Sequence, residues 1–206
     1  MKYIDLMKLP NSTFRNEIIE DRDTFDVLPN ELKEFYLKCN GLVALNCGIQ
    51  FRGCVNQPKW LSLHEIWKGK LSLYDVYESV ESNDIPIAQD AFGDQYLYRV
   101  GQIFQLNSES GDLENLNCTL SQFLKNIETD AVGYLALQQI YKLKEMGIEL
   151  KNGEMMNVFP PFILNSESER SFKPIPAVEQ INYLQNLYVQ TKDLNEGESI
   201  RLEIEI

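Results

Sequence analysis

Two aspartates that flank a glycine are the residues of this sequence best suited to acid–base chemistry. Asp90 and Asp94 lie on either side of Ala91-Phe92-Gly93, and a pair of carboxylates is the usual machinery of glycoside hydrolysis. Aspartate and glycine also populate turns, because both accept the backbone angles that a turn requires. The sequence therefore leaves two alternatives open: a small hydrolase that uses Asp90 and Asp94, or a turn without chemistry.

The other reactive side chains form no familiar catalytic or metal-binding pattern. The single histidine, His64, follows Ser62 in a stretch typical of a capped helical turn, which favours a structural role. Cys47 and Cys54 have no second cysteine pair or nearby histidine, which argues against a zinc site. Phosphate-binding glycine loops and the HExxH and GxSxG motifs are missing. We therefore expect no enzymatic activity, no metal and no cofactor, and we expect reduced, buried cysteines.

The two aspartates lie in a stretch that predicts the centre of a sheet. Alternation at 85–88 and aromatic and β-branched residues at 95–100 indicate strands, with a third strand at 102–106 after Gly101. Thr119 and Gln122 then form a capping box that begins an amphipathic helix, Leu120 to Ile127. We expect three antiparallel strands closed by this helix, with one face of the sheet covered.

Two helices are expected before this sheet. Asn11-Ser-Thr13 can cap a short helix that runs to about Glu20. Pro29 suits the start of a second helix, and Gly41 is expected to end it as a left-handed C-cap. Three shorter elements should follow, namely strands at 42–45 and 49–51 and a helical turn opened by a Ser62–Glu65 capping box.

The chain after the sheet is also expected to be folded, because it is rich in aromatic residues and prolines. Its predicted elements are a helix at 132–146, a hairpin around Asn152-Gly153, a helix at 177–190 and a strand at 199–206. We treat residues 1–130 as one α+β domain with a mostly antiparallel sheet, N-terminal helices and a closing helix. Residues 131–206 are then a C-terminal helix and strand extension packed on it, so that the chain forms one globular unit.

A single hydrophobic core is expected to join the helices to the sheet. Its predicted members, chosen by helix or strand period, are Leu32, Phe35, Tyr36, Tyr96, Tyr98, Phe104, Phe123 and Leu124.

The charge of this 206-residue chain is strongly and unevenly negative. The net charge is −12, and between Leu71 and Leu124 nine acids face one base, Arg99. Nucleic acid and anionic membranes are therefore poor partners, whereas a basic protein is a good one. The six acids expected to form the partner-binding surface are Asp84, Asp90, Asp94, Glu109, Asp112 and Glu114. The alternative is that these acids only keep the protein soluble. The beginning of the sequence has no apolar core typical of a signal peptide, so we expect a cytoplasmic protein.

Several short motifs, taken in order, resemble the SUKH superfamily, which contains immunity-type proteins and the fungal cell-wall glucan synthesis regulator (Smi/Knr type). They are Leu28-Pro29-Asn30-Glu31-Leu32-Lys33-Glu34-Phe35-Tyr36 with Asn40-Gly41, Trp60-Leu-Ser-Leu-His-Glu-Ile66, Ile85-Pro86-Ile87-Ala88, Gly93-Asp94 and Ser121-Gln-Phe-Leu124. The resemblance covers about Val27 to Ile127. It implies a protein-binding module that neutralises a toxin domain, often of nuclease type. The fungal branch implies a signalling scaffold for cell-wall glucan synthesis instead.

Overall fold

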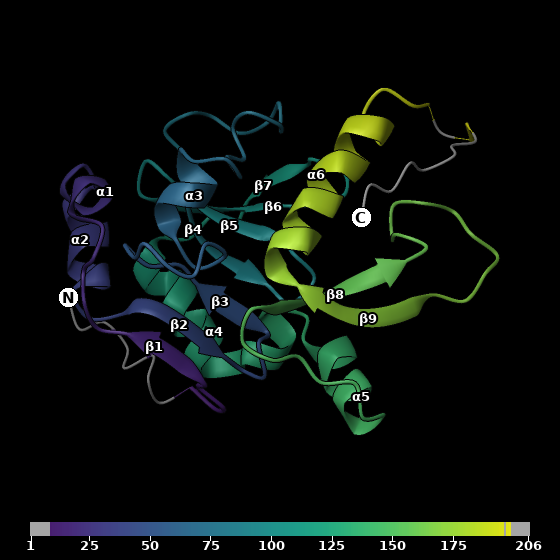
Figure 1. The fold of residues 1–206 in the computed structure, drawn as a ribbon, viewed down its shortest axis with the longest axis horizontal. Helices are drawn as coiled ribbons and strands as arrows, with labels where there is room; N and C mark the ends of the chain where they lie inside the picture. Colours follow the sequence, from purple (N-terminus) through teal and green to yellow (C-terminus); the bar gives the residue numbers. More distant parts are fainter. Residues whose placement is uncertain (1–8, 196, 199–206) are drawn as a thin grey trace.

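The centre of the structure is a seven-stranded antiparallel sheet whose strands lie in chain order (Figure 1). The computed structural model describes residues 9–195, 197 and 198. The strands are β1 Phe14–Asn16, β2 Asn40–Ala44, β3 Ile49–Phe51, β4 Ile85–Asp90, β5 Gln95–Arg99, β6 Gln102–Leu106 and β7 Leu113–Asn115. A tight turn at Val100-Gly101, where both residues have positive φ (47° and 83°), joins β5 to β6. The three central strands and their order are as predicted.

Within the described residues, six helices and a separate two-stranded sheet surround this central sheet (Figure 1). The helices are α1 Arg22–Asp26, α2 Asn30–Tyr36, α3 Leu63–Trp67, α4 Leu120–Tyr134, α5 Gln138–Glu145 and α6 Ala177–Thr191, and the small sheet pairs β8 Glu154–Phe159 with β9 Ser171–Pro176. The α+β class with a mostly antiparallel sheet is therefore confirmed. Within the described part of the chain, none of the helices combines the length and the apolar character needed to cross a bilayer.

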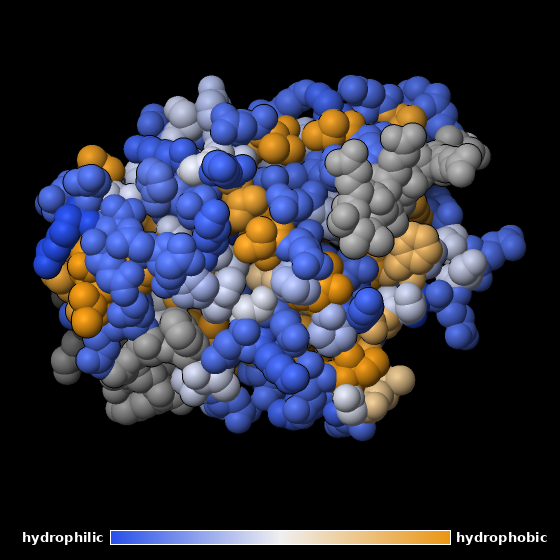
Figure 2. Space-filling view, viewed as in Figure 1, coloured by the Kyte–Doolittle hydropathy of each residue, from blue (hydrophilic) through white to orange (hydrophobic). Residues whose placement is uncertain are grey.

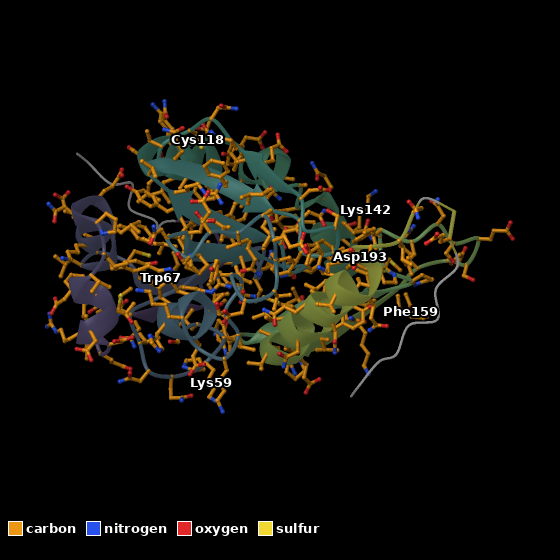
Figure 3. The ribbon with its side chains drawn as sticks, turned by 90° about the horizontal axis from the view of Figure 1, so that it is seen from above. Lys59, Trp67, Cys118, Lys142, Phe159 and Asp193 are labelled. Carbon is orange, nitrogen blue, oxygen red and sulfur yellow. The ribbon has the colours of Figure 1, made fainter. Side chains whose placement is uncertain are left out.

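Helices α4 and α6 cover opposite faces of the central sheet. Tyr96 on β5 packs in one cluster with Phe123 of α4, while its neighbour Leu97 packs in a second cluster with Ile181 of α6. This division follows from the strand period of two, which sends successive side chains to opposite faces. Seen from above, the side of the molecule that carries Cys118 and α4 lies across the sheet from α6 (Figure 3).

Seven of the eight predicted core residues pack in the α4-side cluster, and Phe104 does not. Phe104 is half-buried and packs against the α6-side cluster. The register explains this error, because Phe104 lies directly opposite Leu97 in the β5–β6 ladder. Directly opposed residues project from the same face, so Phe104 follows Leu97 to the side of α6.

Two N-terminal predictions are wrong. Residues 11–20 form no helix, because β1 pairs there with β2 at the edge of the sheet. Helix α2 ends at Tyr36, and Gly41 lies inside β2 with φ +85° rather than at a helix C-cap. A Cβ on Gly41 would lie 2.9 Å from Leu61 Cδ2, so a close approach as well as the backbone angle requires glycine here.

Two predictions after the central sheet are also wrong. The helix expected at 132–146 is divided, because α4 runs to Tyr134 with a kink at Asp130 (φ −150°, ψ 74°) and α5 begins only at Gln138. The turn at Asn152-Gly153 opens no local hairpin, since β8 pairs with the distant strand β9. Helix α6 agrees with its prediction to within one residue. The strand expected at 199–206 lies outside the described residues.

The C-terminal segment contacts the α6-side face of the central sheet directly. Gln50 Nε2 donates to the Glu154 carbonyl of β8 at 3.1 Å, and the amide of Met156 donates to the Ala91 carbonyl at 2.8 Å. Met155 lies in the same buried cluster as Leu97 of β5. The division at residue 130 stays a prediction. The outer surface seen in Figure 2 is mainly hydrophilic, with its apolar side chains in small scattered groups.

Candidate functional site

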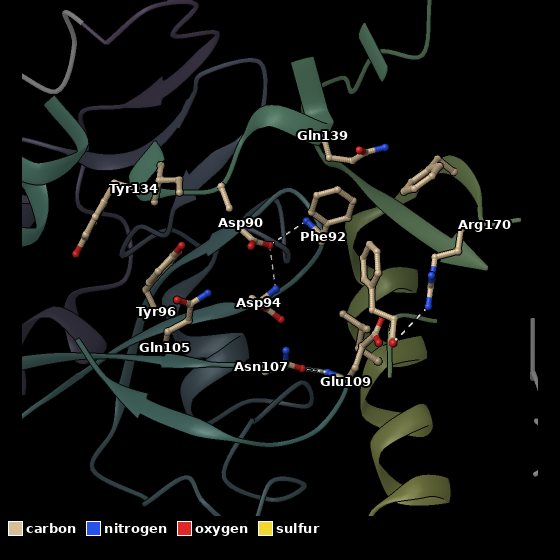
Figure 4. A pocket seen from close by; sticks show the side chains of 15 residues that line it. Asp90, Phe92, Asp94, Tyr96, Gln105, Asn107, Glu109, Tyr134, Gln139 and Arg170 are labelled. Atoms are coloured by element: carbon tan, nitrogen blue, oxygen red, sulfur yellow. Dashed lines mark hydrogen bonds between the residues drawn. The ribbon is translucent and has the colours of Figure 1, made fainter. Parts of the chain in front are cut away.

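A cavity of about 570 Å³ opens where the turn between β4 and β5 faces the C-terminal segment (Figure 4). Three carboxylates, Asp90, Asp94 and Glu109, line it together with one guanidinium, that of Arg170. Five aromatic rings complete this combination, namely Phe92, Tyr96, Tyr134, Phe162 and Phe172. Acidic groups set among aromatic walls form a site that favours a positively charged ligand with an apolar part.

Asp90 organises the turn that carries the other aspartate. Its Oδ1 accepts the amides of Phe92, Gly93 and Asp94 at 2.9, 2.8 and 3.0 Å. Gly93 has φ +109°, and a Cβ there would lie 2.4 Å from Leu184 Cδ1 of α6. The residue types that suggested a turn do form one, and α6 packs directly against it.

A buried polar network holds this turn from within the sheet. Arg52 is fully buried and donates to the carbonyls of Pro86 at 3.1 Å and Ala88 at 3.2 Å. It also donates to the side-chain oxygens of Gln89 and, at 2.5 Å, Gln95. Gln95 Nε2 in turn donates to the Gly93 carbonyl at 2.6 Å. Because buried polar groups must be paired, this chain of contacts fixes the position of the turn relative to β3 and β4.

Burial shapes the electrostatics of both aspartates. Removal from water raises the pKa of Asp90 to about 6, although its three backbone hydrogen bonds oppose the shift. Burial also raises the pKa of Asp94 to about 8, and the nearby charge of Asp90 adds to this effect. The amide of Ser108, 2.9 Å from Asp94 Oδ1, and the side chain of Gln105 act in the opposite direction. Around neutral pH the pair therefore shares a proton that a nearby cation would displace.

Glu109 lies on the other side of the cavity and has partners in the C-terminal segment. Its Oε2 accepts the amide of Ile163 at 2.7 Å. Burial raises the pKa of Glu109, while the amides of Ile163 and Phe162 and the charge of Arg170 lower it. The guanidinium of Arg170 lies over the Phe162 ring, 5.3 Å from its centre. The charge of Arg170 thus partly offsets that of Glu109 on this side of the site.

The structure separates the six acids predicted to bind a partner. Asp90, Asp94 and Glu109 line the cavity, while Asp112 and Glu114 are exposed near β7. Asp84 does not line the cavity. It is 2 % exposed, and its two carboxylate oxygens accept Arg99 Nε at 2.6 Å and Nη2 at 2.5 Å. Strand pairing brings Arg99, the one base between Leu71 and Leu124, directly onto Asp84, and a role of Asp84 in partner binding stays a prediction.

The C-terminal wall of the cavity was missed at the level of sequence. Phe162, Arg170 and Phe172 belong to no motif, and only the aromatic density of their segment indicated that it folds. Pairing of β8 with β9 and packing of α6 bring these residues to the β4–β5 turn.

The other candidate reactive groups have structural surroundings. His64 lies in α3, with Nδ1 3.3 Å from the Thr24 hydroxyl. All four cysteines are free and buried, as expected. Among the described residues, no group of three or more histidine, cysteine, aspartate or glutamate side chains is arranged to hold a metal ion.

Comparison with protein families accounts for the central part of this structure. The model of the SMI1 / KNR4 family (SUKH-1) matches residues 22–126, just over half of the chain, from α1 into α4. The chain belongs to the SMI1/KNR4 family. A comparison with curated proteins finds no match. The family segment supplies Asp90, Asp94 and Glu109 to the cavity, whereas the opposite wall comes from residues beyond it. The site is therefore composite.

Proposed function

We propose that this SMI1/KNR4-family protein is a non-enzymatic, cytoplasmic module that binds and neutralises a basic toxin domain. The observation that carries the proposal is the acidic cavity at the β4–β5 turn, together with the exposed Glu114 on β7 and the exposed Asp112 just before it. Membership of the family supports a protein partner, since its SUKH superfamily contains immunity-type proteins. A toxin that acts on nucleic acid has a positive surface. An acidic protein surface can imitate the charge of the nucleic acid and bind there.

The exposed acids near β7 are not offset by Arg99, the one base between Leu71 and Leu124, because Arg99 is already paired. Arg99 contacts the buried Asp84 and also Glu81, whose Oε1 lies 3.2 Å from Nη1. It therefore does not offset Asp112 or Glu114, which are exposed. An uncompensated field of this kind speeds association with a cation more than it slows dissociation.

Association kinetics test this proposal. Binding of a basic nuclease-type toxin domain should slow at least about tenfold as salt rises from about 0.01 to about 0.15 M, because the screening length falls from about 30 to about 8 Å. Asp112→Asn with Glu114→Gln should slow association further at low salt. Glu34→Gln with Glu145→Gln, two exposed acids on α2 and α5, is the charge-matched control and should have a smaller effect. An association rate that ignores salt and both double variants would contradict the proposal.

A hydrolase that uses Asp90 and Asp94 is the second candidate, favoured by one observation. The two carboxylates line the same cavity and both have raised pKa values, as an acid–base pair requires. Against this, Asp90 Oδ1 already accepts three backbone amides and holds the turn. Turnover of a glycoside that disappears in Asp90→Asn with Asp94→Asn, and persists in the exposed Asp75→Asn, would favour the hydrolase.

A further inference from the structure

We propose that the cavity at the β4–β5 turn binds the guanidinium group of one arginine side chain, with Asp90 and Asp94 as its acceptors. The arginine is presented by the protein partner, and in that respect the inference rests on the proposed function. It goes further by replacing a diffuse acidic surface with one defined anchor point.

Asp90 provides the first observation, because half of its carboxylate has no partner. The side chain is only 8 % exposed, and all three of its hydrogen bonds reach Oδ1. No donor from the described residues reaches Oδ2, although Asp90 lines the cavity (Figure 4). Because Oδ2 is not sealed from solvent, it is available to a ligand that enters the cavity. A cation placed in the cavity would supply the missing donor.

Asp94 makes the acceptor pair suitable for a planar, forked donor. It lies four residues further along the same turn and lines the same cavity. In Figure 4 the side chains of Asp90, Asp94, Tyr96 and Gln105 lie together on one side of the cavity. A guanidinium presents five N–H donors in one plane and can bond two carboxylates while its faces stack on rings. An ammonium group has no such plane, which favours arginine over lysine.

The opposite wall already shows how this lining accommodates a guanidinium. The protein's own Arg170 lies with its guanidinium carbon 5.3 Å from the centre of the Phe162 ring. Its charge acts on Glu109, on the C-terminal side of the cavity. Asp90 and Asp94, on the other side, have no cationic partner among the described residues. Arg170 and the open oxygen of Asp90 thus lie on separate sides of the cavity, and Phe92 and Tyr96 supply further rings.

Binding should require ionised aspartates. Burial raises the pKa of Asp94 to about 8 and therefore holds a proton on it at neutral pH, so the arginine must displace this proton. The other titratable or charged groups that face this site are Glu109, Tyr96, Tyr134 and Arg170. Because the pKa of Asp94 is about 8, the affinity for a guanidinium should rise between about pH 6 and about pH 8. Within this range, binding of the guanidinium should release protons.

The experiment uses small probes and the full chain, so that no partner need be known. N-acetyl-L-arginine amide and its neutral isostere N-acetyl-L-citrulline amide are titrated while backbone amides are followed by NMR. The arginine probe should shift the amides of Phe92, Gly93 and Asp94 and bind at least about tenfold more tightly than citrulline. Asp94→Asn should remove this preference, whereas the exposed Asp75→Asn should retain it. The amide spectrum of each variant also shows that it is folded.

N-acetyl-L-lysine amide is titrated as a third probe and should bind more weakly than the arginine probe. Three results would overturn the inference: equal binding of the arginine and citrulline probes, equal binding of the arginine probe by Asp94→Asn and the wild type, or equal binding of the arginine and lysine probes. These results are distinguishable from failure of the proposed function. A toxin domain that binds with salt-dependent kinetics although the probes do not discriminate would leave the protein-binding proposal intact. Selective arginine binding without any toxin complex would leave the pocket and remove the toxin.

Discussion

Asp94→Asn should stabilise the fold, and the gain should grow with pH. Burial and the charge of Asp90 raise the pKa of Asp94 from its ordinary 3.8 to about 8. Between these values the folded protein holds a proton that the unfolded chain has released. Stability therefore falls as pH rises through this window and is fully present only below the unfolded pKa. Asparagine keeps the shape and an acceptor oxygen but cannot ionise, so it removes this loss.

The size of the effect follows from linkage. A difference of one bound proton changes the unfolding free energy by about 1.4 kcal/mol per pH unit. Asp94 is only half-buried, and water screens part of the interaction, so we expect roughly half of that slope. The gain of Asp94→Asn over wild type should then increase by about 2 kcal/mol between about pH 5 and about pH 8. Asp90, with a pKa of about 6, adds its own slope only at the lower end.

Urea unfolding at a series of pH values, followed by tryptophan fluorescence and circular dichroism, measures this gain. Asp75→Asn, which removes an exposed acid of the same type, should run parallel to wild type. If wild type and Asp94→Asn differ by the same free energy at every pH, then Asp94 carries no buried-charge penalty and the reasoning fails. A stabilised variant that no longer prefers arginine over citrulline would show that the site is maintained at a cost in stability.

Two further predictions concern packing. Phe123→Ala should cost about 3–5 kcal/mol of unfolding free energy because the ring is fully buried. Val27→Ala, at a position 61 % exposed, should change the unfolding free energy by less than about 0.5 kcal/mol, and comparable losses in denaturation would refute the core assignment. Gly111→Ala and Gly101→Ala both place a Cβ at positive φ, which costs about 1–2 kcal/mol. Gly111→Ala should lower the thermal stability clearly more than Gly101→Ala, because a Cβ at Gly111 would lie 2.2 Å from Tyr188 Cε2 of α6, whereas nothing lies within 4 Å of a Cβ at Gly101. Equal losses of stability would mean that α6 is not firmly docked there.

Local sequence determined the elements whose stabilising contacts are close along the chain. The capping box at Thr119 forms as predicted, with the Thr119 amide donating to Gln122 Oε1 at 2.9 Å. The three central strands and α6 also follow from period and from turn residues such as Gly101. The capping box and the apolar stripe of α6 involve residues a few positions apart, and the central strands pair with their neighbours in the sequence, so a short window contains the information.

Long-range pairing decided the features that local sequence patterns did not predict. Residues 14–16 become β1 because β2 offers an open edge, and that partner is invisible to a local pattern. Phe104 faces α6 because it stands opposite Leu97, which only the register determines. Asp84 is neutralised inside the protein because Arg99 reaches it from β5. Composition counts such an acid as surface charge, whereas the fold removes it.

The candidate site shows the same division. The sequence singled out Asp90 and Asp94 as a chemically notable pair, because their types and spacing around a glycine are visible without a structure. Their burial, their raised pKa values and the vacant oxygen of Asp90 arise only once α6 closes over the turn. Phe162 and Arg170 join the cavity through the pairing of β8 with β9. The pKa of a carboxylate is raised where packing removes water from it, and that removal depends on residues far apart in the chain.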